Sequence, residues 1–379
     1  MTSPTILLIL KALEGRGAER MVVTLAHAYI EMGCHVHILC LEETQEMPLE
    51  ARVHYHVVPY KQVFTQQNIE PNSKQAQAYQ AVAERIDRYV LEHIGVPDLI
   101  LASIYKVNWI MAYSQLPNIV NVLHTALSKQ FHTQLLEAPT QTVNHLRKVY
   151  GAHRCSCVSE GAHQDLIALL GPLTHTTTIY NPCDVANIQH QANAIPSSAQ
   201  FGLTDKAYII HVASFDTMKG HKDLLRAYAK TAQQLPLVLV GKGRLEAEIK
   251  HLASELNISD RVKFLGFQKN PYPLIASAAL LVLTSTFEGF GYVIVEAQAL
   301  KVPVISTDCP FGPRELLPND NLVPVGDIDR LAQLMEHAIH YLDQYQVPLN
   351  QQLLPRYIAQ KYLEFGSEQD TIRSYTIKQ

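Results

Sequence analysis

The chain has 379 residues, more than one ordinary hydrophobic core holds, so its length favours two domains or one large one. Its composition is 47% hydrophobic and 17% charged, which is typical of a globular protein and unlike a collagen-like or disordered chain. The formal net charge of −4, with histidine counted as neutral, argues against a strongly basic nucleic-acid-binding protein.

Short runs rich in Ile, Leu and Val alternate with helix-like patterns through the N-terminal half. Thr5–Leu10 is an almost unbroken apolar run, as expected of a strand buried on both faces. Ala18–Met32 has apolar residues at helical spacing, and Gly33 is expected to end that helix. Further strands are predicted at His35–Leu41, Leu99–Ala102, Ile119–Leu123, Cys155–Val158 and Thr177–Tyr180. This order predicts a parallel sheet covered by helices.

The same alternation begins again in the C-terminal half. Strands are predicted at Ala207–Val212, Leu237–Val240, Val262–Leu265, Ala279–Leu283 and Val302–Ser306, with helices at Leu224–Ala232 and Leu245–Leu256. We therefore expect an α/β protein with two Rossmann-like, doubly wound domains that face each other across a cleft. In such sheets, ligands bind at the carboxyl ends of the strands.

A polar stretch separates the two halves. Asn181–Gln200 contains two prolines and three asparagines, as expected of a linker. We assign residues 1–182 to an N-terminal domain, 183–202 to the linker and 203–354 to a C-terminal domain. A last helix is predicted at Pro355–Phe365, and the segment 355–379 is expected to pack back on the N-terminal domain.

The cysteines and the apolar runs restrict the class of protein further. The six cysteines form no Cys-x-x-Cys pair, so zinc ribbons and thioredoxin-like sites receive no support. Cys155 and Cys157 would share one face of a strand, where a buried reduced pair is favoured over a metal or redox site. Met1–Leu10 lacks the basic start of a secretory signal, and apolar runs such as Ile275–Leu283 are too short to span a membrane. We expect the chain in the cytoplasm or at a membrane surface.

Glycine-rich turns follow several of the predicted strands. In Glu14–Arg20, glycine lets the backbone approach a ligand, and the first helical turn can bind phosphate. The segment has neither a complete dinucleotide fingerprint nor a Walker loop, so an ordinary strand-to-helix turn explains it equally well. Three more turns follow strands of the C-terminal half and would converge on one sheet edge with the segment 288–296: Met218–His221, Val240–Arg244 and Ser306–Glu315.

The most informative segment is Glu288–Glu296, with the sequence EGFGYVIVE. Its two acids lie eight positions apart, with Glu288 expected just after an apolar strand and Glu296 two turns into the following helix. Eight positions on a helix are a little over two turns, so both carboxylates can lie on related faces along the same cleft. The loop Glu288–Gly291 offers backbone amides at a helix N-terminus, where a diphosphate is stabilised. Carboxylates also suit hydroxyl-rich ligands. A solvated surface pair is the alternative.

Two single residues at strand ends complete the candidate site. Lys219 follows a C-terminal strand and could place positive charge on a phosphate, although a surface lysine is the commoner role. His124 follows Ile119–Leu123 and would face the expected cleft, although a packed or surface histidine is equally consistent.

Taken together, these residues resemble the retaining glycosyltransferases of family 4, which have the GT-B fold. The most specific element is the Glu-x7-Glu pair, Glu288 and Glu296. Cys309–Leu316 is similar to a "GP-R-E" segment of many members. Gly17–Arg20 is similar to the family's "GGAER" turn, with Arg16 where a second glycine is usual.

The resemblance implies a nucleotide-diphosphate sugar donor, most often UDP-linked, held mainly by the C-terminal domain, and an acceptor bound by the N-terminal domain. It implies Glu296 at the ribose hydroxyls, Glu288 at the donor sugar and Lys219 at the leaving pyrophosphate. His124 would lie near the C6 hydroxyl of the donor sugar, so Glu288, Lys219 and His124 are the predicted catalytic residues. Backbone groups would complete the donor site, from Gly17, Gly289, Phe290, Gly291, Val293 and Ile294.

The sequence departs from the family pattern at Ser214, where many members have an arginine that grips the diphosphate together with the lysine. Arg244 or a helix N-terminus would have to compensate. No Asp-x-Asp metal motif stands out, so we expect no metal ion or other cofactor, because cations and dipoles would stabilise the leaving diphosphate.

The expected acceptor is a glycan or lipid-linked glycan of bacterial lipopolysaccharide or polysaccharide assembly, at the cytoplasmic face of the inner membrane. The segment 129–154 could face an anionic membrane or an acceptor phosphate, because it contains Lys129, Arg147, Lys148 and Arg154 against one acid, Glu137. An ordinary solvated helix is an equal explanation. The alternatives are a sugar-nucleotide epimerase or phosphorylase on the same fold, or a non-catalytic nucleotide-sugar-binding protein.

Overall fold

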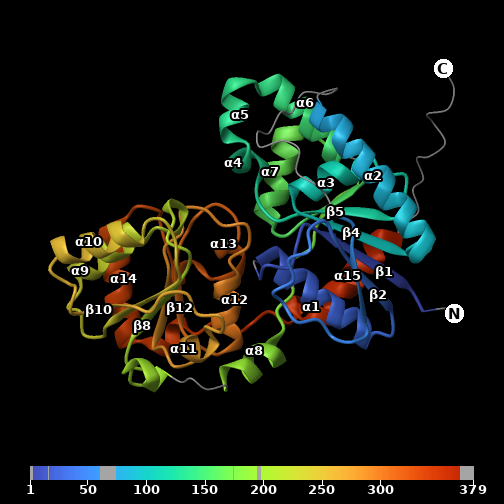
Figure 1. Cartoon of the computed structure of the whole chain (residues 1–379). Coiled ribbons are helices and arrows are strands. Elements are labelled where there is room, and N and C mark those ends of the chain that lie inside the picture. The colour runs from blue at the N-terminus through green and yellow to red at the C-terminus, as the bar shows by residue number, and fades with distance from the viewer. Residues whose placement is uncertain (1–2, 16, 60–73, 174, 194–197, 368–379) are drawn as a thin grey trace. The chain divides into compact units, whose positions relative to one another are not determined.

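A computed structural model describes residues 3–15, 17–59, 74–173, 175–193 and 198–367. The chain divides into two compact units (Figure 1). Unit 1 comprises Met1–Pro182 and Gln352–Gln379, and unit 2 comprises Cys183–Gln351. Across these described ranges, none of the helices combines the length and the apolar character needed to cross a membrane.

Unit 1 contains a seven-stranded parallel sheet in the order β3-β2-β1-β4-β5-β6-β7. The order reverses between β1 and β4, which is the topological switch point of a doubly wound sheet. The central strands are buried apolar runs, as predicted. The strands are β1 (Thr5–Leu10), β2 (His35–Cys40), β3 (Val53–Val57), β4 (Leu99–Ser103), β5 (Ile119–Leu123), β6 (Arg154–Cys157) and β7 (Thr176–Thr178).

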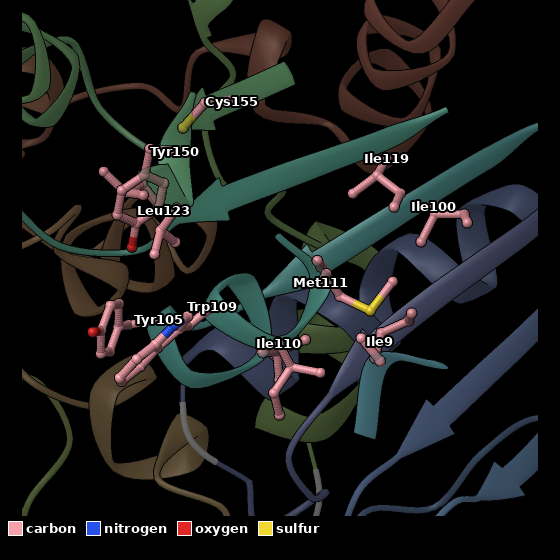
Figure 2. Close-up of a cluster of buried hydrophobic side chains, with 14 of the residues drawn as sticks. Ile9, Ile100, Tyr105, Trp109, Ile110, Met111, Ile119, Leu123, Tyr150 and Cys155 are labelled. Atoms are coloured by element: carbon pink, nitrogen blue, oxygen red, sulfur yellow. The ribbon is translucent and has the colours of Figure 1, made fainter. Parts of the chain in front are cut away.

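Helices lie on both faces of this sheet (Figure 1). They are α1 (Gly17–Glu31), α2 (Lys74–His93), α3 (Tyr105–Met111), α4 (Leu127–Gln130), α5 (His132–Glu137), α6 (Pro139–Tyr150), α7 (Glu160–Leu170) and α15 (Pro355–Ser367). In the core, Ile9 and Ile100 of the sheet belong to the same buried cluster as Trp109 and Met111 of α3 (Figure 2). Burial of each such side chain stabilises the fold by roughly 1.5–3 kcal/mol.

The helix α15 belongs to unit 1 although the whole of unit 2 precedes it in the chain. It packs against α1 and β4. The Tyr29 hydroxyl donates to the Ala359 carbonyl at 3.2 Å. At Gly366 an added Cβ would lie 2.6 Å from the Leu99 side chain, so the two surfaces are in close contact. Residues 368–379 of the predicted C-terminal segment lie outside the described residues.

Unit 2 contains a six-stranded parallel sheet in the order β10-β9-β8-β11-β12-β13, which reverses between β8 and β11. Its strands are β8 (Ile209–Val212), β9 (Leu237–Val240), β10 (Val262–Phe264), β11 (Leu280–Leu283), β12 (Val304–Thr307) and β13 (Leu322–Val323). Its helices are α8 (Val185–Ala192), α9 (His221–Lys230), α10 (Glu246–Glu255), α11 (Tyr272–Ala276), α12 (Tyr292–Ala299), α13 (Pro313–Leu316) and α14 (Ile328–His340). The predicted α/β class with two Rossmann-like sheets is confirmed.

The predicted linker 183–202 contains a folded helix, α8. The Asp184 carboxylate accepts a hydrogen bond from the Asn187 amide and so caps the start of the helix. The Gln189 side chain donates to the Ala299 carbonyl at 3.0 Å and ties α8 to α12. The polar residues that suggested a linker therefore cap and dock a helix instead.

Candidate functional site

The candidate site lies at the carboxyl edge of the sheet in unit 2, beside the switch point between β8 and β11. Lys219 ends a short 3-10 helix (Thr217–Lys219) that follows β8, and Glu288 follows β11. The Lys219 Nζ lies 2.7 Å from the Glu288 Oε1, and their side chains are 24% and 12% exposed. Two residues that the sequence placed on separate turns thus form one partly buried ion pair.

Glu288 is fixed by a second hydrogen bond and by the neighbouring strand. The Ser285 hydroxyl donates to the same Oε1 atom at 2.6 Å. The Thr307 hydroxyl at the end of β12 donates to the Ser285 carbonyl at 2.5 Å. Because hydrogen bonds to an ionised carboxylate are stronger than neutral ones, this arrangement holds Glu288 in one orientation.

The loop that carries Lys219 leaves no room for a side chain at Gly220. This residue has φ 65°, and an added Cβ would lie 1.8 Å from the Thr284 carbonyl oxygen. The Thr284 hydroxyl donates to the Lys219 carbonyl at 3.0 Å. Gly220 therefore lets the loop after β8 lie directly on the end of β11, which brings Lys219 to Glu288.

Ser214 supports this loop through Asp216. The Ser214 hydroxyl donates to one oxygen of the Asp216 carboxylate at 2.5 Å, and the Met218 amide donates to the other at 2.9 Å. Asp216 thus orders the turn that precedes Lys219. The predicted contact between Ser214 and the donor stays a prediction.

Arg244 lies on the turn after β9, next to the Lys219 loop. An added Cβ at Gly241 would lie 1.9 Å from the Ala213 carbonyl oxygen, so the two loops are in contact. The Arg244 side chain is exposed. Its expected part in compensating for Ser214 stays a prediction.

The loop between Glu288 and α12 corrects one expectation from the sequence. Gly291 has φ 94° and caps α12, so the helix begins only at Tyr292. Glu288 precedes the helix and Glu296 lies inside it, as predicted, but Glu296 is only the fifth residue of α12, about one turn into the helix rather than two. The positive φ at Gly291 is the cause, because it delays the start of the helix.

The amides of α12 differ in what they can offer. The Ile294 amide already donates to the Gly291 carbonyl at 2.9 Å, so it can give a ligand only a shared hydrogen bond. The amide of Val293, one residue earlier, lies in the first turn, where orphan N–H groups and the helix dipole favour an anion. Gly289 and Phe290 lie in the loop before this turn. This loop packs closely against Gly312, where an added Cβ would lie 2.2 Å from the Phe290 carbonyl oxygen.

Glu296 differs from Glu288 in being almost fully buried, with 5% exposure. The Tyr272 hydroxyl at the start of α11 donates to the Glu296 Oε1 at 3.2 Å. Tyr272, Ser285 and Asp216 were not identified from the sequence. Ser285 is only three residues before Glu288, whereas Tyr272 is 24 residues from Glu296 and comes near it through the fold.

Cys309 is a further neighbour of the ion pair that the sequence did not single out. Burial, and then the negative charge of Glu288, raise the pKa of the Cys309 thiol to about 12. It is therefore a neutral thiol beside the pair. All six cysteines are buried, unpaired thiols, and Cys155 and Cys157 lie on β6 as predicted.

Two family models match most of the chain between them. A model described as glycosyl transferases group 1 matches residues 196–346, and one described as Glycosyltransferase Family 4 matches residues 15–187. The chain belongs to the family 4 glycosyltransferases. The first model includes Lys219, Glu288 and Glu296, and the second includes Gly17 and His124.

Several curated relatives are named as glycosyltransferases. The chain is 36% identical over 40% of its length to the N-acetylgalactosamine-N,N'-diacetylbacillosaminyl-diphospho-undecaprenol 4-alpha-N-acetylgalactosaminyltransferase of Campylobacter jejuni, of which it covers 40%. It is 30% identical over 59% of its length to the N-acetyl-alpha-D-glucosaminyl L-malate synthase of Bacillus anthracis, of which it covers 58%. It is 29% identical over 48% of its length to the lipopolysaccharide 1,6-galactosyltransferase of Escherichia coli K12, of which it covers 51%. The matches thus span about two-fifths to three-fifths of these relatives.

Solved structures match nearly the full length of this chain. HepE of Anabaena, crystallised with UDP and glucose, is 21% identical with a TM-score of 0.68, over 95% of each chain. The lipopolysaccharide outer core galactosyltransferase WaaB in its apo form is 20% identical with a TM-score of 0.65, over 95% of this chain and 97% of that one. These likenesses confirm the predicted GT-B fold with its two Rossmann-like units.

Two predicted site residues of this family 4 protein lie in unit 1. Gly17 is the first residue of α1, and the neighbouring Arg16 lies outside the described residues. His124 follows β5, and its Nε2 is buried without a hydrogen-bond partner among the residues described. Burial lowers the pKa of His124 to about 4, so its ring is neutral at pH 7. Their part in a donor site stays a prediction.

The segment 129–154 does not present all of its basic residues to solvent. Arg154 is buried, so the expectation of a basic surface is wrong for this residue, and His145 of the same segment is also buried. Arg147 is exposed but its guanidinium donates to the Leu170 carbonyl at 3.0 and 2.8 Å. Helix periodicity explains the difference, because α6 turns His145 toward the core.

The chemistry of the site is that of a cation and carboxylates at a helix N-terminus. In the part of the chain that the structure describes, no three His, Cys, Asp or Glu side chains are arranged to hold a metal ion. The expectation that no cofactor is needed stays a prediction. Lys219 can neutralise a phosphate and Glu288 can accept hydrogen bonds from hydroxyls.

Proposed function

We propose that this chain is a retaining glycosyltransferase that moves a hexosyl group from a UDP-linked donor to a glycan or lipid-linked glycan acceptor. The observation that carries the proposal is the 2.7 Å contact between Lys219 and Glu288 at the switch point of unit 2. It is supported by relatives named for transfer to lipopolysaccharide or to an undecaprenol-linked sugar, and by HepE, solved with UDP-glucose.

Lys219 would act on the leaving group. Cleavage of the anomeric C–O bond leaves an oxocarbenium-like sugar and a diphosphate with added negative charge. Lys219 and the first-turn amides of α12 would stabilise that charge. Each well-placed donor in a closed site contributes about 2.7–4 kcal/mol to such a transition state.

Glu288 would orient rather than attack. Its Oε1 already accepts hydrogen bonds from Lys219 and Ser285, which makes it a poor nucleophile. In the proposed reaction the acceptor hydroxyl attacks on the face that the diphosphate leaves, so the anomeric configuration is retained. Glu288 holds Lys219 in place and binds hydroxyls of the donor sugar.

The acceptor context follows from the names of the relatives. They support assembly of lipopolysaccharide or another surface polysaccharide. We place the reaction on the cytoplasmic face of the inner membrane as part of the proposal, because a lipid-linked acceptor would lie there. The epimerase, phosphorylase and non-catalytic alternatives are not favoured, because the relatives carry transferase or synthase names.

The test begins with a thermal-shift screen of UDP-, GDP- and ADP-sugars. A ligand at 100 times its dissociation constant stabilises the protein by about 2.7 kcal/mol, and we expect this response with UDP-sugars. Transfer is then measured as UDP release that depends on added lipid-linked or lipopolysaccharide acceptor. Proton NMR of the product should show the anomeric configuration of the donor. No response to any nucleotide, or an inverted product, would overturn the proposal.

A further inference from the structure

Glu296 is a buried carboxylate whose orientation depends on a neighbouring tyrosine. Glu296 is 5% exposed and Tyr272 is 9% exposed. The Tyr272 hydroxyl donates to the Glu296 Oε1 at 3.2 Å. Burial of a carboxylate is costly unless hydrogen bonds compensate for the lost water, so this contact helps to set the position of the side chain.

Tyr272 is itself fixed by its backbone. It stands between Pro271 and Pro273, whose rings restrict φ at both neighbouring positions. The Asn270 side chain accepts a hydrogen bond from the Tyr272 amide at 3.2 Å and donates to the Gln191 carbonyl of α8 at 2.9 Å. These contacts fix the backbone that carries the Tyr272 phenol, independently of its hydrogen bond to Glu296.

The neighbouring Cys183 indicates that Glu296 lies in a buried, low-dielectric environment. Burial, and then the charge of Glu296, raise the pKa of the Cys183 thiol to about 12. The same thiol donates to the Val295 carbonyl at 3.7 Å, one residue from Glu296. In such a low-dielectric environment a hydrogen bond to a carboxylate is stronger than in water.

We propose that Tyr272 is a positioning residue that fixes the Glu296 carboxylate for binding the ribose diol of the donor nucleotide. The inference rests on the proposed function and on the role of Glu296 at the ribose hydroxyls that the family resemblance implies. Tyr272 binds one carboxylate oxygen and so restricts the direction in which the carboxylate can accept hydrogen bonds from two adjacent hydroxyls. The site would therefore select a nucleotide with both hydroxyls over one without them.

The experiment compares UDP with 2′,3′-dideoxyuridine diphosphate by isothermal titration calorimetry. The full-length protein should bind UDP at least tenfold more tightly than the dideoxy compound. The substitution Tyr272→Phe should weaken UDP binding about tenfold or more, because one hydrogen bond to a charged group is lost, and change dideoxy binding by less than twofold. In turnover, the donor KM should rise by the same factor while kcat stays within twofold.

Tyr208→Phe is the matched control. Tyr208 is fully buried, and its hydroxyl donates to the Leu274 carbonyl of the same helix, α11, at 2.5 Å. The control removes a tyrosine hydroxyl that contacts α11, and it leaves the contact with Glu296 intact. It should lower thermal stability, and the ratio of UDP to dideoxy affinity should stay that of the unmodified protein.

A double substitution isolates the contact. In a Glu296→Gln background, Tyr272→Phe should weaken UDP binding by less than twofold further. An equal loss of UDP and dideoxy affinity in Tyr272→Phe would mean a structural role and overturn the inference, as would unchanged UDP binding. If the unmodified protein binds UDP without regard to the diol, the inference fails while the proposed function stands. If it binds no nucleotide at all, both fail.

Discussion

The two sheets have the same strand order around their switch points, yet their carboxyl edges differ in charge chemistry. In unit 2, Lys219 and Glu288 follow the two strands that flank the reversal, and their side chains are 24% and 12% exposed. In unit 1, Lys11 follows β1 and pairs at 3.1 Å with Glu42, which follows β2, with 33% and 30% exposure. Both units have a carboxyl edge at which a lysine and a glutamate can pair. The loops that follow the strands determine how far each ion pair is removed from water, and the pair of unit 2 is the more buried.

The first strand-to-helix turn shows the same difference in its backbone. Gly220 of unit 2 packs against a carbonyl, whereas Gly15 of unit 1 has no described atom within 4 Å of an added Cβ, although its φ is 88°. The turn in unit 2 therefore needs glycine because its backbone lies directly against the Thr284 carbonyl. The turn in unit 1 needs glycine for its dihedral angle alone.

The largest expected effect tests this difference directly. Gly15→Ala should cost about 1–2 kcal/mol, the strain of a left-handed residue. Gly220→Ala should destabilise unit 2 by about 4 kcal/mol or more, because its Cβ cannot fit beside the Thr284 carbonyl. Trp109, the one tryptophan of the sequence, lies in unit 1, so its fluorescence follows that unit while far-UV circular dichroism follows both. Equal losses in the two variants would break the comparison.

The next largest effect concerns the ion pair of unit 2. Lys219→Met and Glu288→Gln should each lower kcat/KM for the UDP-sugar by about 100- to 1,000-fold, because both disturb the charge that faces the leaving diphosphate. Lys230→Met is the control, since Lys230 forms an exposed pair with Asp329 in the same unit. That variant should keep activity within twofold. Activity of Lys219→Met within tenfold of the unmodified protein would remove Lys219 from the mechanism.

Buried histidines give both units a dependence on acid. Burial lowers the pKa of His145 in unit 1 and of His211 in unit 2 to about 4, and that of His221 to about 2. Below about pH 6.5 these histidines take up protons in the unfolded chain but stay neutral in the folded protein. The free energy of unfolding therefore falls as the pH drops from about 6.5 toward the folded pKa, and it does not depend on these groups above about pH 6.5. Each histidine contributes up to about 1.4 kcal/mol per pH unit.

The units can be told apart by substitution. His145→Gln should flatten the pH dependence of the Trp109 transition between about pH 6.5 and 4 by up to one proton, and leave the unfolding of unit 2 unchanged. Urea denaturation at pH 7, 5.5 and 4.5 measures this slope. An unchanged slope would show that His145 binds its proton as readily in the folded state as in the unfolded chain, and would contradict the lowered pKa.

The fold was largely predictable because buried parallel strands are uninterrupted apolar runs. Thr5–Leu10, Ile119–Leu123 and Leu237–Val240 have the same bounds in the sequence and in the structure. The edge strand β3 was missed because its sequence, VHYHV, is rich in histidine. The helix α8 was missed because its polar residues make tertiary contacts that composition does not reveal.

The site was predictable in its residues but less so in its contacts. Lys219 and Glu288 were found because charged residues follow strands, but their 2.7 Å contact joins positions 69 residues apart. Tyr272 gave no signal, because a tyrosine between prolines resembles a turn, and its role depends on where Glu296 lies. The placement of Glu288 before the helix and of Glu296 within it was correct, but Glu296 lies about one turn rather than two into α12, because the dihedral angle of Gly291, which sets the start of the helix, cannot be read from the residue type alone.

The smallest expected effect concerns Arg244, the exposed cation proposed to compensate for Ser214. Because its side chain is solvated, Arg244→Ala should raise the donor KM only about two- to threefold, leave kcat unchanged, and lose its effect near 1 M salt. Arg226→Ala, which removes another exposed arginine from α9, is the control and should change neither constant. A tenfold or greater loss that persists in salt would mean that Arg244 turns inward on the diphosphate when the donor binds. Two cations at the edge of unit 2, Lys219 and Arg244, would then share the charge of the leaving group.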